Sequence, residues 1–487
     1  MPVNDRDPQW AKFNEARAKV SDLFEGRESA ITHIHPLPGW DAATLAGISE
    51  LAYFLPIVAR TAETFGGLVF QKAPQRIGIP DGLKPYLNDV TQTGQEIDRF
   101  AEQALDGVLL TGSILVLTDY PASDVPMTKA EAEKIGRRPV LRLYDGDSIL
   151  AARKTLIQGV LKLTHVRLLE TAEVPDGEDG FAVRIENRVR VLDLTDGVYT
   201  QTLWTEGQDG WVAGETITPQ MDGKALDHIP ADFSNTRDGE ARAAKPPLAD
   251  LADISIAHLN NSAQYEWALA WLGSPMLFGA GITLAEGETI QMGASSAVMA
   301  PDATAKLEIV QADGAKFSGL KTAMDDKRRD AAANGARMLL EATRQAVTAE
   351  TSRNERAGEA SVVVSMANAV SQCLTNAIRR LARWAQVSGA DDCLYWLNDK
   401  LLPSKLSAQD VTAYLEAWIK GALTKAELFA LFQQGELIDP SKTIEEHEAE
   451  QIEEAPDPAT ADDMTAALGG DASTEPPAEI QDTEAQA

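Results

Sequence analysis

The stretch "PPLADLADISIAHLNNSAQYEWALAWLGSP", residues 246–275, is where the character of the chain changes. Proline is tolerated in the first turn of a helix. The apolar residues that follow recur at helical spacing, so the pattern predicts a long helix over 248–274. Its apolar stripe consists of Leu248, Leu251, Ser255, Leu259, Ala263, Trp267 and Ala270. Gly273, Ser274 and Pro275 then predict its end.

Upstream of this helix, residues 100–235 have the pattern of an α+β region. "EIDRFAEQALDGVLLTGSILVLTDYP" places Phe100, Ala104, Leu105 and Val108 on one helical face, breaks at Gly112, and continues as an apolar run. This order predicts a helix, a turn and a buried strand. "RPVLRLYDGDSIL", "VLKLTHVRLLE", "FAVRIENRVRVLDLTDGVYTQTLW" and "GWVAGETITP" predict further strands, in antiparallel pairs with turn residues between them.

An earlier apolar stretch, "AYFLPIVARTAETFGGLVFQKAP" at 52–74, raises the question of a membrane span. Arg60 and Glu63 interrupt it, and a span needs about 20 predominantly apolar residues. The spacing of Ala52, Leu55, Ala59, Ala62 and Phe65 instead predicts a helix with one apolar face. We expect Gly66 and Gly67 to loosen this helix before a short strand or turn at 68–70.

Downstream of Pro275 the pattern alternates between β-like and helical segments. A Gly-rich interval over 279–313 has "ETIQMG" (288–293) and "AKLEIVQ" (305–311) as its expected strands. The next predicted helix has a thin apolar stripe and buries little unless it packs beside other helices or other copies of itself. A polar segment, "VTAETSRNERAGEA", is expected to be a loop, and an amphipathic helix follows through Val362 and Trp384. Residues 407–434 predict two more helices, split near Gly421.

The composition indicates a soluble, intracellular chain with more than one core. Its 487 residues include two cysteines, which argues against a disulfide framework. The N-terminus lacks the apolar segment of a signal peptide, and no stretch is long enough to cross a bilayer. The net charge is −30, and fourteen Asp and Glu with no Lys or Arg follow Lys442. We therefore expect a disordered acidic tail over 441–487, with at most a helical turn near 443–454.

Motifs for catalysis or cofactor binding are missing from the sequence. Gly223-Lys224 lacks the upstream glycine of a phosphate-binding loop, and neither H-E-x-x-H nor G-x-S-x-G occurs. His33-x-His35 has no paired Cys or acidic cluster, so a polar loop is favoured over a metal site. Asp145-Gly146-Asp147-Ser148 lacks the remaining ligands of a calcium loop, and a strand-ending turn is favoured. Gly279-Ala280-Gly281 is a weak phosphate cradle. We expect no enzyme activity, no cofactor and no metal.

One long segment is net basic although the chain is acidic. Between Lys316 and Arg383 lie twelve Lys and Arg against seven Asp and Glu. Two readings stay open for this segment. Its charges either cover solvated helix faces as i,i+4 pairs or face a nucleic acid.

The succession of segments resembles the wing, stem, clip, stem and tunnel-loop order of tailed-bacteriophage portal proteins. The stretches at 52–74 and 246–281, with "GVLLTGSILVLTDYP", "RPVLRLYDGDSIL" and "NGARMLLEATRQAVTAETSRNERAGEASVVVSMANAV", are similar to a phage family known as DUF4055, whose members resemble portals. The resemblance spans about residues 40–400. It implies an N-terminal segment (1–39), a wing-like α+β domain (40–247), a stem helix (248–274), a clip-like β region (275–314), a second stem helix (315–342), a tunnel loop (343–360), a C-terminal helical region (361–440) and the acidic tail (441–487).

The resemblance implies a homo-oligomeric ring, usually of twelve subunits, at one vertex of the virion capsid. Double-stranded DNA passes through such a ring during packaging and ejection, while the ring contacts terminase, the major capsid protein and a head-tail connector or tail protein, without a membrane. The ring would be assembled in the host cytoplasm. The residues expected in the tunnel loop are Arg344, Arg353, Asn354 and Arg356. Two alternatives remain open. One is an oligomeric scaffold or adaptor without DNA passage, and the other is an enzyme that acts on a polymer.

Overall fold

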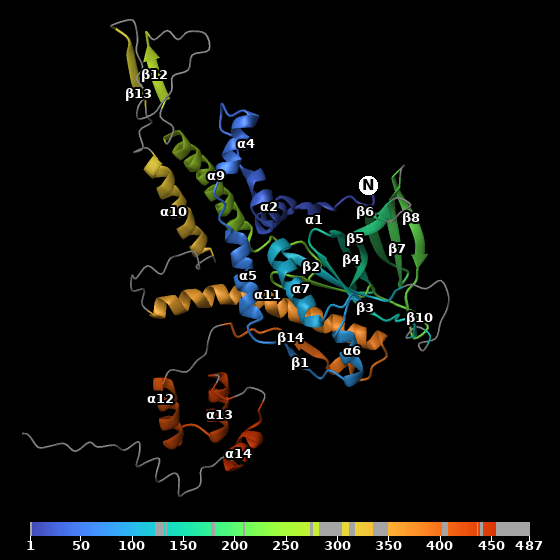
Figure 1. Ribbon diagram of the computed structural model, residues 1–487. Coiled ribbons are helices and arrows are strands. Elements are labelled where there is room, and N and C mark those ends of the chain that lie inside the picture. Colours follow the sequence, from blue (N-terminus) through green and yellow to red (C-terminus); the bar gives the residue numbers. More distant parts are fainter. Residues whose placement is uncertain are drawn as a thin grey trace, which may run out of the picture. The chain divides into compact units, whose positions relative to one another are not determined.

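The computed structural model describes residues 2–121, 131, 134–176, 181–207, 210–272, 276–281, 304–310, 317–334, 349–401, 408–435, 437–438 and 442–453. The chain forms two compact units, Met1–Leu401 and Leu402–Ala487. Helices and antiparallel strands both build the first unit, so the predicted α+β class is confirmed (Figure 1).

Helices form the N-terminal part of the first unit. They are α1 (Pro8–Ala11), α2 (Asn14–Glu25), α3 (Arg27–Ala30), the 3-10 helix η1 (Ile31–His33), α4 (Ala42–Leu51) and α5 (Ile57–Val69). Val20 and Leu23 from α2, Ile48 from α4 and Val58 from α5 are fully buried in one apolar cluster. This cluster also receives the helix after residue 248, so the N-terminal helices form the support on which that helix packs.

Helix α5 corrects the expectation for the apolar stretch at 52–74. The predicted helix is present, but it continues through Gly66 and Gly67 to Val69, and no strand follows at 68–70. Val69 is fully buried in the central core, and the Phe70 N–H donates to the Gly66 carbonyl at 2.9 Å. This burial outweighs the roughly 1 kcal/mol by which each glycine disfavours a helix. The buried face is also rotated relative to the prediction, because Ala59 is only half-buried.

The predicted helix, turn and buried strand after residue 96 are confirmed as α7 (Ile97–Thr111) and β2 (Ser113–Asp119), whose residues are all buried. Gly112 ends α7 in the left-handed conformation, with φ of +82°. Strand β2 lies between β3 (Val140–Asp145) and β11 (Ala231–Asn235) in a three-stranded antiparallel sheet. The chain therefore folds back at Gly112 and places β2 in the core.

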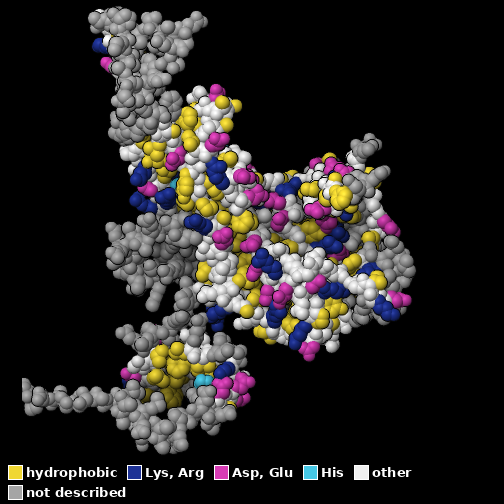
Figure 2. Space-filling view, in the orientation of Figure 1, with side chains coloured by type: hydrophobic (Ala, Val, Ile, Leu, Met, Phe, Trp, Pro, Cys, Tyr) yellow, Lys and Arg dark blue, Asp and Glu magenta, His cyan; other side chains and the backbone are white. Residues whose placement is uncertain are grey.

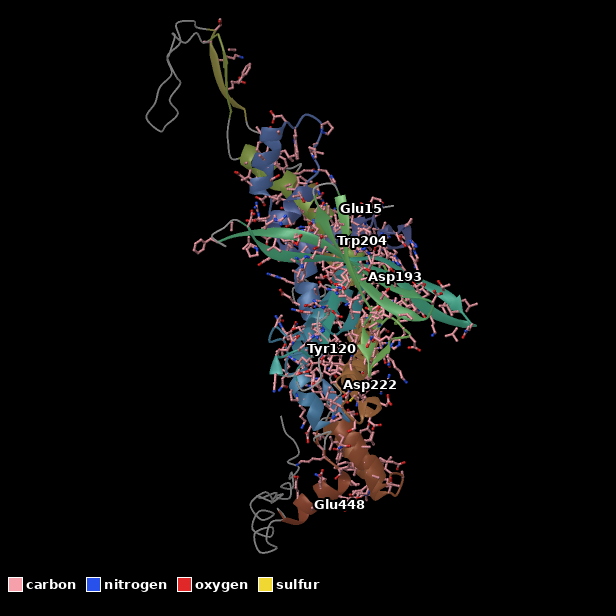
Figure 3. The ribbon with its side chains drawn as sticks, turned by 90° about the vertical axis from the view of Figure 1, so that its right-hand side faces the viewer. Glu15, Tyr120, Asp193, Trp204, Asp222 and Glu448 are labelled. Carbon is pink, nitrogen blue, oxygen red and sulfur yellow. The ribbon has the colours of Figure 1, made fainter. Side chains whose placement is uncertain are left out.

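A second sheet is an antiparallel meander of five strands. They are β4 (Ile149–Ile157), β5 (Val160–Asp176), β6 (Ala182–Thr195), β7 (Val198–Gly207) and β8 (Gly210–Ile217). These strands agree with the segments expected from the sequence. Figure 3 labels Asp193 of β6 and Trp204 of β7. The Asp193 carboxylate accepts a hydrogen bond from Nδ1 of His165 on β5 at 2.6 Å. Trp204 packs against the buried Val189 and its neighbours.

Short elements close the central core around helix α11 (Ala349–Trp384). They are β1 (Gln75–Ile77), η2 (Asp81–Leu83), α6 (Lys84–Leu87), β9 (Gln220–Met221), β10 (Lys224–Ala225), η5 (Ala390–Asp392) and β14 (Leu394–Trp396). Strand β1 pairs with β14 although more than three hundred residues separate them. Cys373 of α11 and Cys393 are both buried and free, and burial raises the pKa of each thiol.

The second unit contains α12 (Ala408–Ile419), α13 (Lys425–Gln434) and α14 (Ile444–Glu453). The predicted helix pair and its split near Gly421 are confirmed, and Thr424 with Glu427 forms a capping box at the start of α13. Helix α14 differs from the predicted acidic tail over 441–487, since it is a full helix. Its His447 ring lies 5.4 Å from the Phe429 ring, and Glu448 pairs with Lys425 at 3.0 Å. The remainder of the predicted tail, 454–487, lies outside the described residues.

Candidate functional site

The long helix predicted from residue 248 is α9 (Ala249–Leu272). Asp250 lies in its first turn and pairs with Lys245, which places a negative charge at the positive end of the helix dipole. Leu248, Leu251 and Leu259 are buried against α2, α4 and α5. The N-terminal half of α9 is therefore part of the core of the first unit.

Beyond Ala263, α9 is mostly apolar, with Glu266 as its one charged residue, but it is not fully buried. Residues 265–272 read "YEWALAWL", and every residue from Gln264 to Ala270 is half-buried or exposed. Leu269 is 37% exposed. A helix that is apolar all round is normally buried. Figure 2 shows apolar side chains beside charged ones over α4, α9 and α10.

Polar side chains are also buried along α9, at Ser255, His258 and Ser262. The Ser262 hydroxyl accepts a hydrogen bond from the Tyr53 N–H at 3.0 Å. Burial, with Arg328 and Lys327 nearby, lowers the pKa of His258 to about 4, so its imidazole is neutral at pH 7. Its Nε2 atom has no hydrogen-bond partner among the residues that the structure describes.

We expect His258 to make the protein less stable in acid. The folded-state pKa of about 4 lies below the ordinary value of 6.5, so the unfolded chain binds a proton that the folded protein does not. The free energy of unfolding contributed by His258 is therefore complete above about pH 6.5 and falls by about 3 kcal/mol as the pH drops to 4. Urea unfolding of His258→Gln and of the unchanged protein from pH 4 to 7 measures the difference. A difference that stays constant with pH would contradict this expectation.

Helix α10 (Ser318–Ala333) packs beside α9 (Figure 1). Unlike α9, it is rich in charged residues. Residues 325–330 read "DDKRRD". Arg329 pairs with Asp326 at 2.9 Å and Arg328 with Asp325 at 3.8 Å, in partly exposed pairs worth about 0 to 1 kcal/mol each. Only Ala331 and Ala332 of the described part of α10 are buried. The prediction that this helix buries little by itself is confirmed for that part.

Two strands follow α9 along the chain and precede α10. Strand β12 (Met276–Ala280) pairs antiparallel with β13 (Lys306–Val310), and Met276 lies opposite Val310. Strand β13 matches the strand expected at 305–311, whereas the strand expected at 288–293 lies outside the described residues. Gly279 and Ala280 end β12, and Gly281 follows them in a bend. The residues after Gly281 lie outside the described part of the chain.

The residues expected in a tunnel loop have a different local structure. Arg344 lies outside the described residues. Arg353, Asn354 and Arg356 belong to α11, so the loop expected over 343–360 is wrong from Ala349 onward. This segment lacks an apolar stripe, but it is rich in Ala, Glu and Arg, which favour a helix, and it spaces opposite charges three residues apart. Any role of these side chains in a channel stays a prediction.

Helix α11 also carries a polar stripe and an ion pair that the sequence reading missed. Arg380 binds the buried carboxylate of Asp232 on β11, 148 residues away, and burial raises the pKa of Asp232 to about 6. Asn368, Gln372 and Asn376 precede this arginine at intervals of four residues. Spacing by four residues places these polar side chains on one face of the helix, and the sequence shows it, but only the apolar face was used to predict this helix.

Two other weak motifs have structural explanations. His33 binds Asp22 at 2.8 Å, and the His35 N–H donates to the Asn260 side chain at 2.8 Å, so the pair joins η1 to α2 and α9. Asp145 accepts hydrogen bonds from the backbone of Asp147 and Ser148, which forms the expected turn between β3 and β4. The described residues contain no group of three metal-ligating side chains. Among them, no helix is both long and apolar enough to cross a membrane.

Comparisons with known proteins give few matches that can be interpreted. The family described as "Domain of unknown function (DUF4055)" matches residues 247–385, from the start of α9 to the end of α11. No curated protein matches the chain. The solved structures that match include one described as "Neck of empty GTA particle computed with C6 symmetry". That chain is 15% identical, with a TM-score of 0.40, and the match covers 83% of this chain and 98% of that chain.

Proposed function

We propose that the chain is a portal-type subunit of a tailed-phage-like virion. Subunits assemble into a closed ring at one capsid vertex, and double-stranded DNA passes through its centre during packaging and ejection. The ring contacts terminase, the major capsid protein and a head-tail connector or tail protein. The subunit itself has no catalytic step in this proposal, since the motor is a separate protein.

The observation that carries this proposal is the contrast between α9 and α10. Residues 264–270 of α9 are mostly apolar and none of them is fully buried, and the neighbouring helix α10 buries little beyond Ala331 and Ala332. Water contact with this much apolar helix is unfavourable at about 25 cal/mol for each Å². A ring of identical subunits removes this surface from water, because each α9 meets a different face of the next copy and the arrangement closes on itself.

Electron micrographs of the purified full chain in negative stain test the proposal. Annular particles with a central hole support it. Monomers or compact oligomers without a hole would contradict it, and the latter would favour the scaffold or adaptor alternative. Hydrolysis of DNA or another polymer by the purified chain would favour the enzyme alternative.

Replacing Leu269 by Glu should prevent ring assembly. A carboxylate at this position would have to be desolvated at every interface of the ring, whereas in the isolated subunit the side chain is already 37% exposed. We expect the fraction of chains in rings to fall at least about tenfold, with an unchanged melting temperature of the subunit. Size-exclusion chromatography with light scattering measures this fraction.

The matched control is Val212→Glu on β8, where the side chain is 59% exposed and lies far from α9 in sequence. It should assemble normally. Normal rings from Leu269→Glu would show that the exposed end of α9 is not an interface between subunits.

Channel passage is tested at Arg353 and Arg356. Phosphate contacts by arginine add salt-sensitive affinity for DNA, and a mixture of charges would keep those contacts brief. Replacing both arginines by Glu should leave rings intact and lower the amount of packaged DNA per ring by about tenfold, because like charges would repel the phosphates. Packaging reactions with purified rings, followed by nuclease protection, measure this amount.

Arg99→Glu, on the exposed surface of α7, is the control and should package normally. If the Arg353/Arg356 variant forms few rings but packages normally per ring, the arginines pair between subunits with Glu350 or Glu355. Normal rings with normal packaging would remove both roles.

A further inference from the structure

A hollow lies along the polar side of α11. Its volume is about 490 Å³, and its walls come from α11, β11 and the loop after β11. From α11 it is lined by the carboxamide ladder, which we define as Asn368, Gln372 and Asn376. The opposite wall includes Lys154 of β4, which pairs with Glu240, and the exposed Arg237. The carboxylates of Asp232 and Asp238 also line it, so the positive charge along this side of α11 comes from the arginines farther along the helix.

The spacing of the carboxamide ladder matches an extended peptide. Residues four apart on a helix are separated by about 6 Å along its axis. Backbone groups on one side of an extended chain repeat every second residue, at about 6.7 Å. A carboxamide has both donors and an acceptor, so it can bind a peptide N–H and C=O together. Three such groups in register therefore suit a peptide backbone lying along α11.

The ladder is only partly saturated by its own neighbours, since Asn376 also hydrogen-bonds the Asp232 carboxylate. Gln372 Nε2 donates to Asn376 Oδ1 at 3.1 Å. The Oδ1 atom of Asn368 is inaccessible to water and has no hydrogen-bond partner among the described residues. A buried acceptor left unpaired costs about 1 to 3 kcal/mol, and a bound backbone N–H relieves this cost once the Asn368 carboxamide turns its oxygen toward the hollow.

An arginine cluster continues the same side of the helix beyond Asn376. It consists of Arg379, Arg380 and Arg383, which line a second hollow of about 310 Å³ together with Asn376 and Asp391. Each guanidinium is held by one contact. Arg379 Nε donates to the Cys393 carbonyl at 2.9 Å, Arg380 binds Asp232, and Arg383 binds Asp391. Guanidinium groups fixed in this way are suited to carboxylates, which they can bind through two hydrogen bonds.

We infer that the carboxamide ladder and the arginine cluster form one groove for an extended acidic peptide, and that this peptide is the C-terminal tail of a second copy of the chain. The assignment to a second copy rests on the proposed ring. The ladder holds the peptide backbone, and the arginines bind its carboxylates. From Asn368 to Arg383 the helix advances about 22 Å, the length of about seven extended residues.

Charge and length favour the tail as the occupant. Residues 454–487 carry nine Asp and Glu and no Lys or Arg. These 34 residues can reach up to about 110 Å when extended, and several prolines favour an extended backbone. A DNA strand could also bind the arginines and carboxamides, but the carboxylates of Asp232, Asp238 and Asp391 that line these hollows would repel its phosphates. A ring supplies one tail for each groove, so every site can be filled equally.

Photocrosslinking in the full chain tests the groove. Ser365 lines the same hollow, is exposed and is not part of the ladder, so Ser365→p-benzoylphenylalanine places the reactive ketone beside the ladder and keeps all three carboxamides. Equal amounts of unlabelled and nitrogen-15-labelled chains are mixed, irradiated and digested for mass spectrometry. We expect crosslinks from position 365 to peptides of 454–487, including pairs that join a labelled to an unlabelled copy.

Variants separate the two parts of the groove. In the crosslinking chain, Arg379→Gln with Arg383→Gln should lower the yield of tail crosslinks by about tenfold, and this loss should shrink at high salt as the unchanged groove also weakens. Asn368→Ala should lower the yield about threefold at all salt concentrations. Arg99→Gln should not change it. Thermal melts of each variant show whether the fold is intact.

Crosslinks to other segments, no crosslinks, or a yield that does not depend on the arginines in folded variants would overturn the groove. Crosslinks to the tail only within one copy would overturn the assignment to a second copy. Micrographs of the same samples keep this test apart from the proposed function. Rings without tail crosslinks would contradict the groove and leave the portal proposal standing. Tail crosslinks between copies in samples without rings would support the groove and contradict the portal proposal.

Discussion

Replacing Arg380 by alanine should lower the free energy of unfolding by about 2 to 3 kcal/mol at pH 7. Protonation of Asp232 limits the charge part of this loss to about 1.4 kcal/mol, and the lost hydrogen bond adds about 1 kcal/mol. Asp232 is 8% exposed, and Arg380 is its charged partner. Removal of the guanidinium leaves a buried carboxylate without compensation, which is the most destabilising way to break such a pair. The contact also joins β11 to α11, so its loss weakens the packing of the central core. Urea unfolding followed by circular dichroism measures the change.

The destabilisation should diminish in acid. Burial raises the pKa of Asp232 from 3.8 to about 6, so between these values the folded protein binds a proton that the unfolded chain does not. The contribution of Asp232 to the free energy of unfolding therefore falls as the pH rises through this window. Without Arg380 the Asp232 carboxyl is still harder to ionise. The loss of unfolding free energy in the variant should therefore be largest above pH 6 and smallest near pH 4.

Two results would decide whether the pair acts in this way. The double variant Asp232→Asn with Arg380→Gln removes both charges while keeping the shapes, and should recover most of the lost stability at pH 7. An Arg380→Ala variant that is equally destabilised at pH 4 and pH 7 would show that packing, and not charge, explains the effect. Comparing each variant with the unchanged protein at the same pH cancels the opposite contribution of His258.

Replacing Gly112 by alanine should cost about 2 to 5 kcal/mol of unfolding free energy. Its φ of +82° disfavours any side chain by about 1 to 2 kcal/mol. A Cβ atom at this position would also lie 2.5 Å from the Ala244 carbonyl oxygen, which belongs to the backbone and cannot rotate away. Relieving that contact has to shift the segment before α9, at a further cost of about 1 to 3 kcal/mol. The melting temperature and the urea midpoint both report the loss.

Gly197 provides the matched comparison. It has a φ of +77° in the turn between β6 and β7, and a Cβ atom there would meet nothing within 4 Å. Gly197→Ala should therefore cost only the conformational part, about 1 to 2 kcal/mol. Equal losses at the two glycines would show that the close approach of residue 244 is not important for stability.

The sequence was most informative where a local pattern and a turn residue agreed. Helix α7 and strand β2 were predictable because the apolar face ends just before Gly112. The pattern failed at Gly66 and Gly67, since burial of α5 outweighs the preference of glycine, and over 349–360, where helix-forming residues continue α11 without an apolar stripe. Pairing between distant strands such as β1 and β14 leaves no local signal, because it depends on the whole chain.

The candidate site was less predictable than the fold. The order of α9, β13 and α10 followed from periodicity and charge, but no pattern shows that the C-terminal half of α9 stays unburied, since burial depends on what packs nearby. Asp232 and Arg380 are 148 residues apart, so their pairing was not accessible from spacing. The channel role of Arg344, Arg353, Asn354 and Arg356 is still a prediction.

The two buried cysteines allow local opening of the protein to be measured by thiol labelling. A thiol reagent reacts with the thiolate, and burial both shields Cys373 and Cys393 and raises the pKa of each. Labelling therefore requires that the structure around α11 or β14 first opens. When reclosing is fast, the labelling rate divided by the rate for an unfolded thiol gives the equilibrium constant for opening. The unmodified chain can thus report local opening of its central core separately at Cys373 and at Cys393.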